Sequence, residues 1–257
     1  MPSVLYRTDL VAPPAVAADQ SRLIVPGNLQ GKTEHFSVYL DPALGADGTQ
    51  DAEGVLGKCE GDYATVAGYF GGLAAGPFNV ILFANPGGAY HQTCAATDLF
   101  CDARTSPADG DYSEFLNVAE FVEVFEALQA GGWDCGMSNG EGLSRVLATD
   151  AYPKELDGFA TAPSWLDSSR PNFVDRNENS DTNTPANGCS VLFLNWMRFQ
   201  LNFTWQQITE GAAPTLAQTY SKLTGKNDGF RQFASLIDSQ FPKGRPSGLL
   251  TDNPFPL

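Results

Sequence analysis

The stretch that most constrains the fold is CSVLFLNWMRFQLNF, residues 189–203, which is apolar nearly all round a helical wheel. A helix without a polar face has to be enclosed by other elements on every side. Helical spacing of apolar residues recurs in 138–152, 214–225 and 228–241, which can supply that enclosure. The second half of the chain is therefore predicted to be helical, with residues 189–203 at its centre.

The first half has a different pattern, in which short β-branched and aromatic runs are separated by turn formers. Strands are predicted at 3–11, 21–27, 35–42 and 78–83, an edge strand or bend at 87–94, and helices at 51–72 and 112–130. This order predicts an α+β fold in one compact domain, 1–257. It would have a sheet-bearing lobe with the long helix (1–131) and a helical lobe (132–257), and the proline-rich tail 242–257 would lie extended.

Composition narrows the functions. Fifteen Lys and Arg against thirty Asp and Glu give a formal net charge of −15, which disfavours nucleic acid as a partner. No apolar run approaches the roughly 20 residues that span a bilayer, and residues 1–20 do not have the pattern of a signal peptide. The low charge content and Asn/Thr/Ser-rich loops favour a secreted protein whose signal peptide has been removed, and a cytoplasmic location stays open.

The five cysteines are Cys59, Cys94, Cys101, Cys135 and Cys189. Cys94 and Cys101 enclose a short loop that a local disulfide could close. Two disulfides and one free thiol are the preferred count, with five reduced buried thiols as the alternative. None of the cysteines forms a CxxC pair, and the chain has only two histidines, so a structural zinc site is not expected.

The word Ala119-Glu120-Phe121-Val122-Glu123 in the long helix, followed by Asn139-Gly140-Glu141-Gly142-Leu143-Ser144-Arg145, resembles the active-site words of the zincin metallopeptidases, and among them the gluzincins. In that family a mixed sheet precedes a helix bearing HExxH, and a second helix supplies a glutamate ligand. Here Glu123 and Glu141 are eighteen positions apart, and 87–94 stands where zincins place the substrate-binding edge strand. The resemblance covers about residues 36–150 and implies a zincin-like fold.

The motif is degenerate, because Ala119 replaces the first histidine and Glu123 the second. The resemblance implies Glu120 as the general base and Glu141 as the third-ligand glutamate. On a helical wheel, Glu123 and Glu126 flank the apolar stripe and Glu120 points further out. The competing interpretation is that all three glutamates form the polar flank of a surface helix.

Glu141 also fits a capping box with Ser138, in which its carboxylate would bond the helix end and leave the site. His91, on the glycine-flanked segment 87–94, could face the acidic helix if the zincin layout holds. His91, Glu123 and Glu141 are then the candidate ligands of one divalent metal ion. With Glu120 they are the candidate catalytic set of a residual hydrolase, and metal-free acid–base chemistry by the same residues is the alternative. His35 is expected to be structural.

These patterns give a secreted protein of degenerate metallopeptidase-like fold, with an acidic cleft that binds a divalent metal or a cationic ligand. The alternatives are a carbohydrate-active enzyme with paired glutamates and a non-catalytic extracellular binding module, so peptide and carbohydrate both stay open as ligands. Two further patterns are weaker. The Asp175–Asp181 loop has the alternating oxygens of calcium loops, and a set of aromatic residues could line a sugar-binding cleft: Trp133, Tyr152, Trp165, Trp196 and Trp205.

Overall fold

The computed structural model describes residues 27–83, 88–103, 111–129, 131–178 and 183–241. Its strands are β1 (Asn28–Lys32), β2 (Phe36–Leu40), β3 (Phe78–Phe83), β4 (Ala89–Tyr90) and β5 (Asp98–Asp102). Its helices are α1 (Gly45–Tyr69), α2 (Tyr112–Leu128), α3 (Ser138–Ala151), α4 (Ala162–Leu166), α5 (Thr184–Phe199), α6 (Trp205–Glu210), α7 (Leu216–Thr224) and α8 (Gly229–Gln240). Short 3-10 helices span Pro42–Leu44 and Leu156–Phe159.

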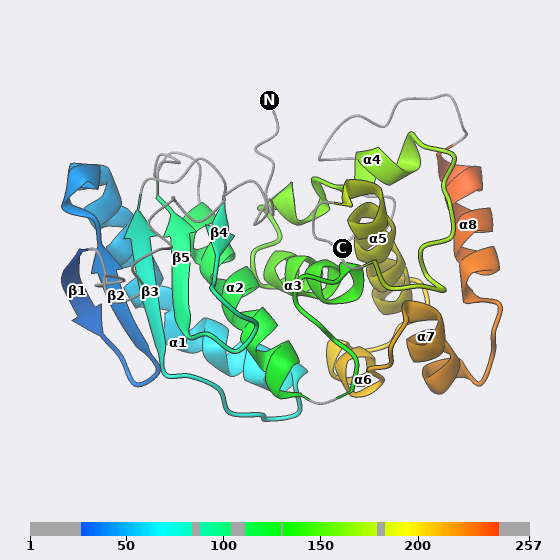
Figure 1. Ribbon diagram of the computed structural model, residues 1–257, viewed down its shortest axis with the longest axis horizontal. Coiled ribbons are helices and arrows are strands. Elements are labelled where there is room, and N and C mark those ends of the chain that lie inside the picture. Colours follow the sequence, from blue (N-terminus) through cyan, green and yellow to red (C-terminus); the bar gives the residue numbers. More distant parts are fainter. Residues whose placement is uncertain (1–26, 84–87, 104–110, 130, 179–182, 242–257) are drawn as a thin grey trace.

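The α+β class is confirmed. The sheet has the order β1-β2-β3-β5-β4, with β2, β3 and β5 parallel and the edge strands β1 and β4 antiparallel to their neighbours. Figure 1 shows the sheet at one end of the molecule and α4 to α8 at the other, with α3 between them. Among the described helices, none is long and apolar enough to cross a membrane.

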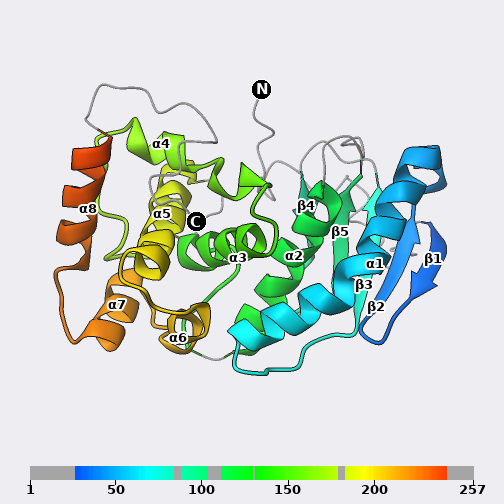
Figure 2. The ribbon, with the colours of Figure 1, turned by 180° about the vertical axis from the view of Figure 1, so that it is seen from behind.

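Alternation along the strands decides which face of the sheet meets the helices. Phe36, Val38 and Leu40 of β2 belong to the main core, as do the corresponding residues of β3 and β5. Tyr39 and Ile81 lie on the opposite face in a small aromatic cluster. Helix α1 runs along the main-core face (Figure 2), where it buries Val55 and Val66. The parallel neighbours β2 and β3 are connected through this helix.

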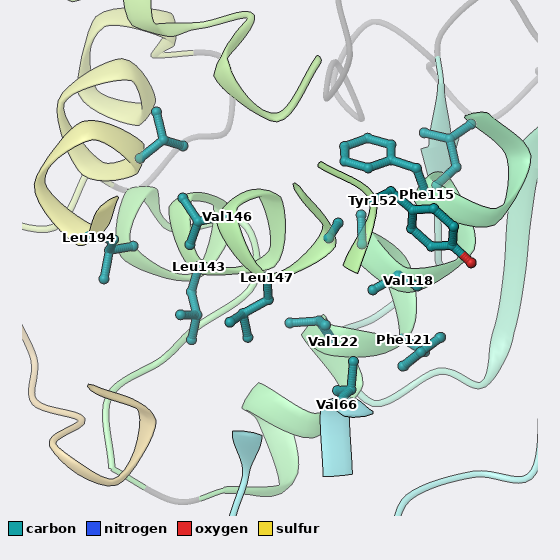
Figure 3. Packing of buried hydrophobic residues seen from close by; sticks show 14 of the residues in the cluster. Val66, Phe115, Val118, Phe121, Val122, Leu143, Val146, Leu147, Tyr152 and Leu194 are labelled. Carbon is teal, nitrogen blue, oxygen red and sulfur yellow. The ribbon is translucent and has the colours of Figure 1, made fainter. Parts of the chain in front are cut away.

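Helix α2 is enclosed on all sides, and every residue from Tyr112 to Glu126 is buried. Figure 3 shows side chains of α2, among them Val118 and Val122, in one apolar layer with Leu143 and Leu147 of α3. The expectation that its glutamates form the flank of a surface helix is therefore wrong, since β4, β5, α1 and α3 pack around it. The main core includes residues from both predicted lobes, and the lobe boundary at 131 stays a prediction.

Glycine lets α3 approach its neighbours closely. A Cβ added at Gly142 would lie 2.7 Å from Cβ of Ser190 on α5, and one at Gly140 would overlap the carbonyl of Asp134. Helix α5 is buried from Ala186 to Met197, which confirms the apolar run as the central helix of the second half. The two glycines beside Glu141 are thus explained in part by packing. Gly142 lies against α5, and Gly140 lies against the backbone of Asp134.

Several expectations are corrected. The helix expected at 189–203 ends earlier, at Phe199 of α5. Exposed Asn202 has φ +62° in the turn before α6, whose capping box is formed by Thr204 and Gln207. The local disulfide does not form, because Cys101 is buried in β5 and Cys94 pairs with Cys135, and the five cysteines make one disulfide and three free thiols where two disulfides and one free thiol were expected. The strand expected at 3–11, all but the last residue of the strand expected at 21–27, and the tail 242–257 lie outside the described residues.

Candidate functional site: a buried histidine–glutamate centre

His91 reaches the long helix because of its place beside the edge strand. Ala89 of β4 contributes to the main core, and two residues further along His91 returns to the same face of the sheet. Its Nε2 lies 3.0 Å from Oε2 of Glu123, between side chains that are 5% and 4% exposed. The structure therefore brings together two of the predicted site residues, from segments 32 positions apart.

Glu123 is also linked to α3. The hydroxyl of Ser144 is 3.4 Å from Glu123 Oε1 and 3.3 Å from the carbonyl oxygen of Glu141, one turn earlier on the same helix. Ser144 thus connects the carboxylate of α2 with the backbone of α3. The sequence gives no signal for this role of Ser144, since a buried serine has no local signature.

Glu141 contacts Arg145 and the backbone that precedes α3. Its Oε2 lies 3.0 Å from Nη2 of Arg145 in an ion pair whose side chains are 2% and 0% exposed, and its Oε1 accepts from the amide of Gly136 at 3.1 Å. The predicted capping box is not formed, because Met137 is the N-cap residue and has no capping side chain. Ser138 donates instead to Asn177 Oδ1, which also accepts from the amide of Asn139.

Glu120 and Glu126 are the least satisfied groups of the cluster. Both are 1% exposed, and no hydrogen-bond partner among the described residues reaches Glu120 Oε2 or either oxygen of Glu126. Nδ1 of His91 is likewise without a partner in the described part of the chain. The prediction from the helical wheel that Glu120 points away from the protein interior is wrong, because it assumed that one side of α2 faces solvent. Buried polar atoms of this kind call for a proton, water or an ion.

The charges of the cluster act on one another. Burial, followed by the charge of Glu123, raises the pKa of Glu120 well above the usual carboxyl range, and the same two causes raise the pKa of Glu126. Burial lowers the pKa of His91, but the hydrogen bond and charge of Glu123 outweigh it and raise it to about 9. The centre therefore favours protons or another cation over further negative charge.

A third potential ligand lies beside the pair. His91, Glu123 and Cys135 each offer one ligand atom within 4.8 Å of the others, so this group could hold a metal ion. However, the sulfur of Cys135 is bonded to Cys94, and a disulfide sulfur is a far poorer ligand than a thiolate. Glu141, predicted as the third ligand, does not belong to this group. Cys135 was not predicted as a ligand, because the sequence does not show that the segment before α3 lies beside His91 and Glu123.

The other candidates lie elsewhere. His35 donates its amide to Glu60, places Nδ1 2.7 Å from that carboxylate and stacks on Tyr63. The aromatic residues expected in a sugar-binding cleft are all buried: Trp133, Tyr152, Trp165, Trp196 and Trp205. The described part of the predicted calcium loop does not support calcium, because Asn177 is engaged with α3 and Arg176 pairs with Glu178; residues 179–182 lie outside it.

Comparison with known proteins adds no relative to this arrangement: no protein-family model, no curated protein and no solved structure matches the chain.

Proposed function

We propose that this chain binds one divalent transition-metal ion at the His91–Glu123 pair, between β4 and α2. The observation that carries the proposal is the 3.0 Å contact of His91 Nε2 with Glu123 Oε2 in a nearly solvent-free position. Two ligands about 2.1 Å from a zinc ion lie about 3.0–3.4 Å apart in tetrahedral or octahedral geometry. The pair thus has the spacing of two neighbouring ligands.

The donor set fits such an ion. Imidazole with carboxylate oxygens suits Zn²⁺, Mn²⁺ or Fe²⁺. Glu120, one turn before Glu123 on α2, has a buried oxygen without a partner in the described residues, but its carboxylate does not belong to the group of His91, Glu123 and Cys135, so it would act as negative charge beside the ion. Glu141 is fixed by Arg145, so it would act as a nearby negative charge. When bound, the ion would supply Lewis-acid chemistry.

The zincin resemblance is part of this proposal. It is supported by the mixed sheet with an antiparallel edge strand, by α2 packed against that edge, and by a glutamate on the next helix. Ala119, in the place of the first histidine, is fully buried and cannot coordinate. Because the glutamates are also buried, the proposal concerns binding of a small ion and does not extend to hydrolysis of peptides.

Secretion is also proposed. The Cys94–Cys135 disulfide supports it, because structural disulfides form and persist mainly in oxidising compartments.

A second candidate is favoured by one observation. Glu123 and Glu141 each already face a cation, His91 and Arg145. In this case the charges are a purely structural network, and the chain is a non-catalytic extracellular binding module. The two candidates differ in what happens when metal is offered to the protein, because a network already neutralised by its own side chains gains little from an added ion.

Calorimetric titration of Zn²⁺ and Mn²⁺ into chelator-treated full-length protein, with the disulfide intact, tests the proposal. One equivalent should bind, and His91→Ala or Glu123→Ala should weaken binding by at least about tenfold. His35→Ala is the matched control, because it removes the other histidine of the chain. Absence of binding, or binding that survives both changes, would favour the structural network instead.

A further inference from the structure

The disulfide beside the metal-binding pair is itself placed to act on it. Cys94 follows His91 by three residues, and Cys135 lies in the connection between α2 and α3. The bond therefore ties the histidine-bearing segment to the connection that follows α2, the helix of Glu123. The sulfur of Cys135 is also within 4.8 Å of the ligand atoms of His91 and Glu123.

Accessibility separates these two cysteines from the other three. Cys94 and Cys135 are half-buried, and the flanking Gln92, Thr93 and Asp134 are exposed. Cys59, Cys101 and Cys189 are free and fully buried, and burial raises the pKa of each thiol. The bonded pair is thus more accessible to a reducing thiol in solution than the three free cysteines are.

We infer that the Cys94–Cys135 disulfide is a redox switch for metal affinity at the His91–Glu123 site, an inference that rests on the proposed function. Attack by a dithiol breaks the S–S bond, leaves thiols on Cys94 and Cys135, and converts the dithiol to its own disulfide. Two electrons and two protons pass to the protein. When metal then binds, the Cys135 thiol releases its proton to solvent and its sulfur bonds to the ion.

The chemistry of the ligands gives the direction of the switch. With the disulfide closed, the group offers one imidazole and one carboxylate beside a sulfur that has no thiolate charge. With the disulfide reduced, the group offers nitrogen, oxygen and thiolate, a three-ligand set typical of zinc and cobalt sites. Reduction should therefore raise affinity for Zn²⁺ and Co²⁺ by at least about tenfold. It should raise affinity for Mn²⁺ much less, since a hard ion gains little from sulfur.

The test uses Co²⁺, whose bonds to thiolate give a near-ultraviolet charge-transfer band. Full-length Cys94→Ser protein, titrated without oxygen, should bind one Co²⁺ with this band and at least about tenfold more tightly than Cys94→Ser/Cys135→Ser. Adding His91→Ala to Cys94→Ser should abolish the tight binding. Wild-type protein, reduced with a dithiol that is then removed, should bind Co²⁺ as Cys94→Ser does. This control shows whether a folding defect of the variant affects the result.

The outcomes separate the two proposals. If the double variant binds metal through His91 and the free thiol adds neither affinity nor the band, the switch is overturned and the metal site stands. If the free thiol gives a band that is indifferent to His91→Ala, the sulfur binds on its own and the switch is overturned, whereas loss of the metal site itself would appear as absence of binding to the protein with the disulfide intact.

Discussion

Arg145 and Glu141, one helical turn apart on α3, form an ion pair with 3.0 Å between Nη2 and Oε2 while both side chains are almost completely buried. Removing one partner of such a pair leaves an uncompensated charge in the interior. Arg145→Met should therefore lower the free energy of unfolding by about 3–5 kcal/mol, measured by urea denaturation.

The matched control is Arg176→Met, because Arg176 pairs with Glu178 at 2.9 Å but is 57% exposed. An exposed pair should be worth no more than about 1 kcal/mol. The double variant Glu141→Gln/Arg145→Met should recover part of the stability lost in Arg145→Met. Equal effects at Arg145 and Arg176 would contradict the buried network.

Glu126 should make the protein less stable as pH rises. Its pKa is raised above the ordinary 4.5 by burial and by Glu123, so the folded chain keeps a proton that the unfolded chain releases. From about pH 4.5 up to the pKa of Glu126 in the folded chain, this group should lower the free energy of unfolding by about 1.4 kcal/mol per pH unit. Glu126→Gln should remove that share of the slope in melts between pH 4 and 8. Glu53→Gln, at an exposed position of α1, controls for the lost charge; an equal change of slope in both variants would refute the burial of Glu126.

Two helical glycines should respond oppositely to alanine. At Gly142 a Cβ would lie 2.7 Å from Ser190 Cβ, so Gly142→Ala should destabilise by about 1–3 kcal/mol although alanine favours helices. At Gly57 on α1 nothing lies within 4 Å, so Gly57→Ala should stabilise by about 0.5–1 kcal/mol. Thermal unfolding of both variants measures this, and stabilisation by Gly142→Ala would show that α3 and α5 are further apart.

Asn202 should carry a glycan if the chain passes through a eukaryotic secretory pathway. The sequon Asn202-Phe203-Thr204 lies between α5 and α6, and its Asn202 and Thr204 are exposed. Mass spectrometry of protein secreted from such a host should show added mass that an endoglycosidase or Asn202→Gln removes. Secreted protein without this mass would show that the turn is not used.

The sequence predicts much of the fold because periodicity is local. Apolar spacing places α2, α3 and α5, and the run Phe78–Phe83 gives the central strand β3. Strand β5 was missed because its apolar core, Leu99-Phe100-Cys101, is short and flanked by aspartates. The same omission explains the wrong cysteine pairing, since a bond to Cys94 required Cys101 to lie in a short loop.

The site was harder to predict because it depends on how the helices pack around one another in the folded protein. The zincin resemblance pointed to His91 and Glu123, which the structure brings into contact. The resemblance could not predict that α2 has no solvent-facing side, so Glu120 was wrongly expected to point away from the protein interior. The spacing of four residues between Glu141 and Arg145 on α3 was a usable signal for an ion pair.

The most direct test of a metal centre at His91 and Glu123 is elemental analysis, by plasma mass spectrometry, of full-length protein purified without chelators. Wild type and His35→Ala should contain about one equivalent of a divalent transition metal, and His91→Ala and Glu123→Ala should contain almost none. A metal-free wild type that remains metal-free after exposure to Zn²⁺ would contradict the proposed site, as would metal content that is equal in all four proteins.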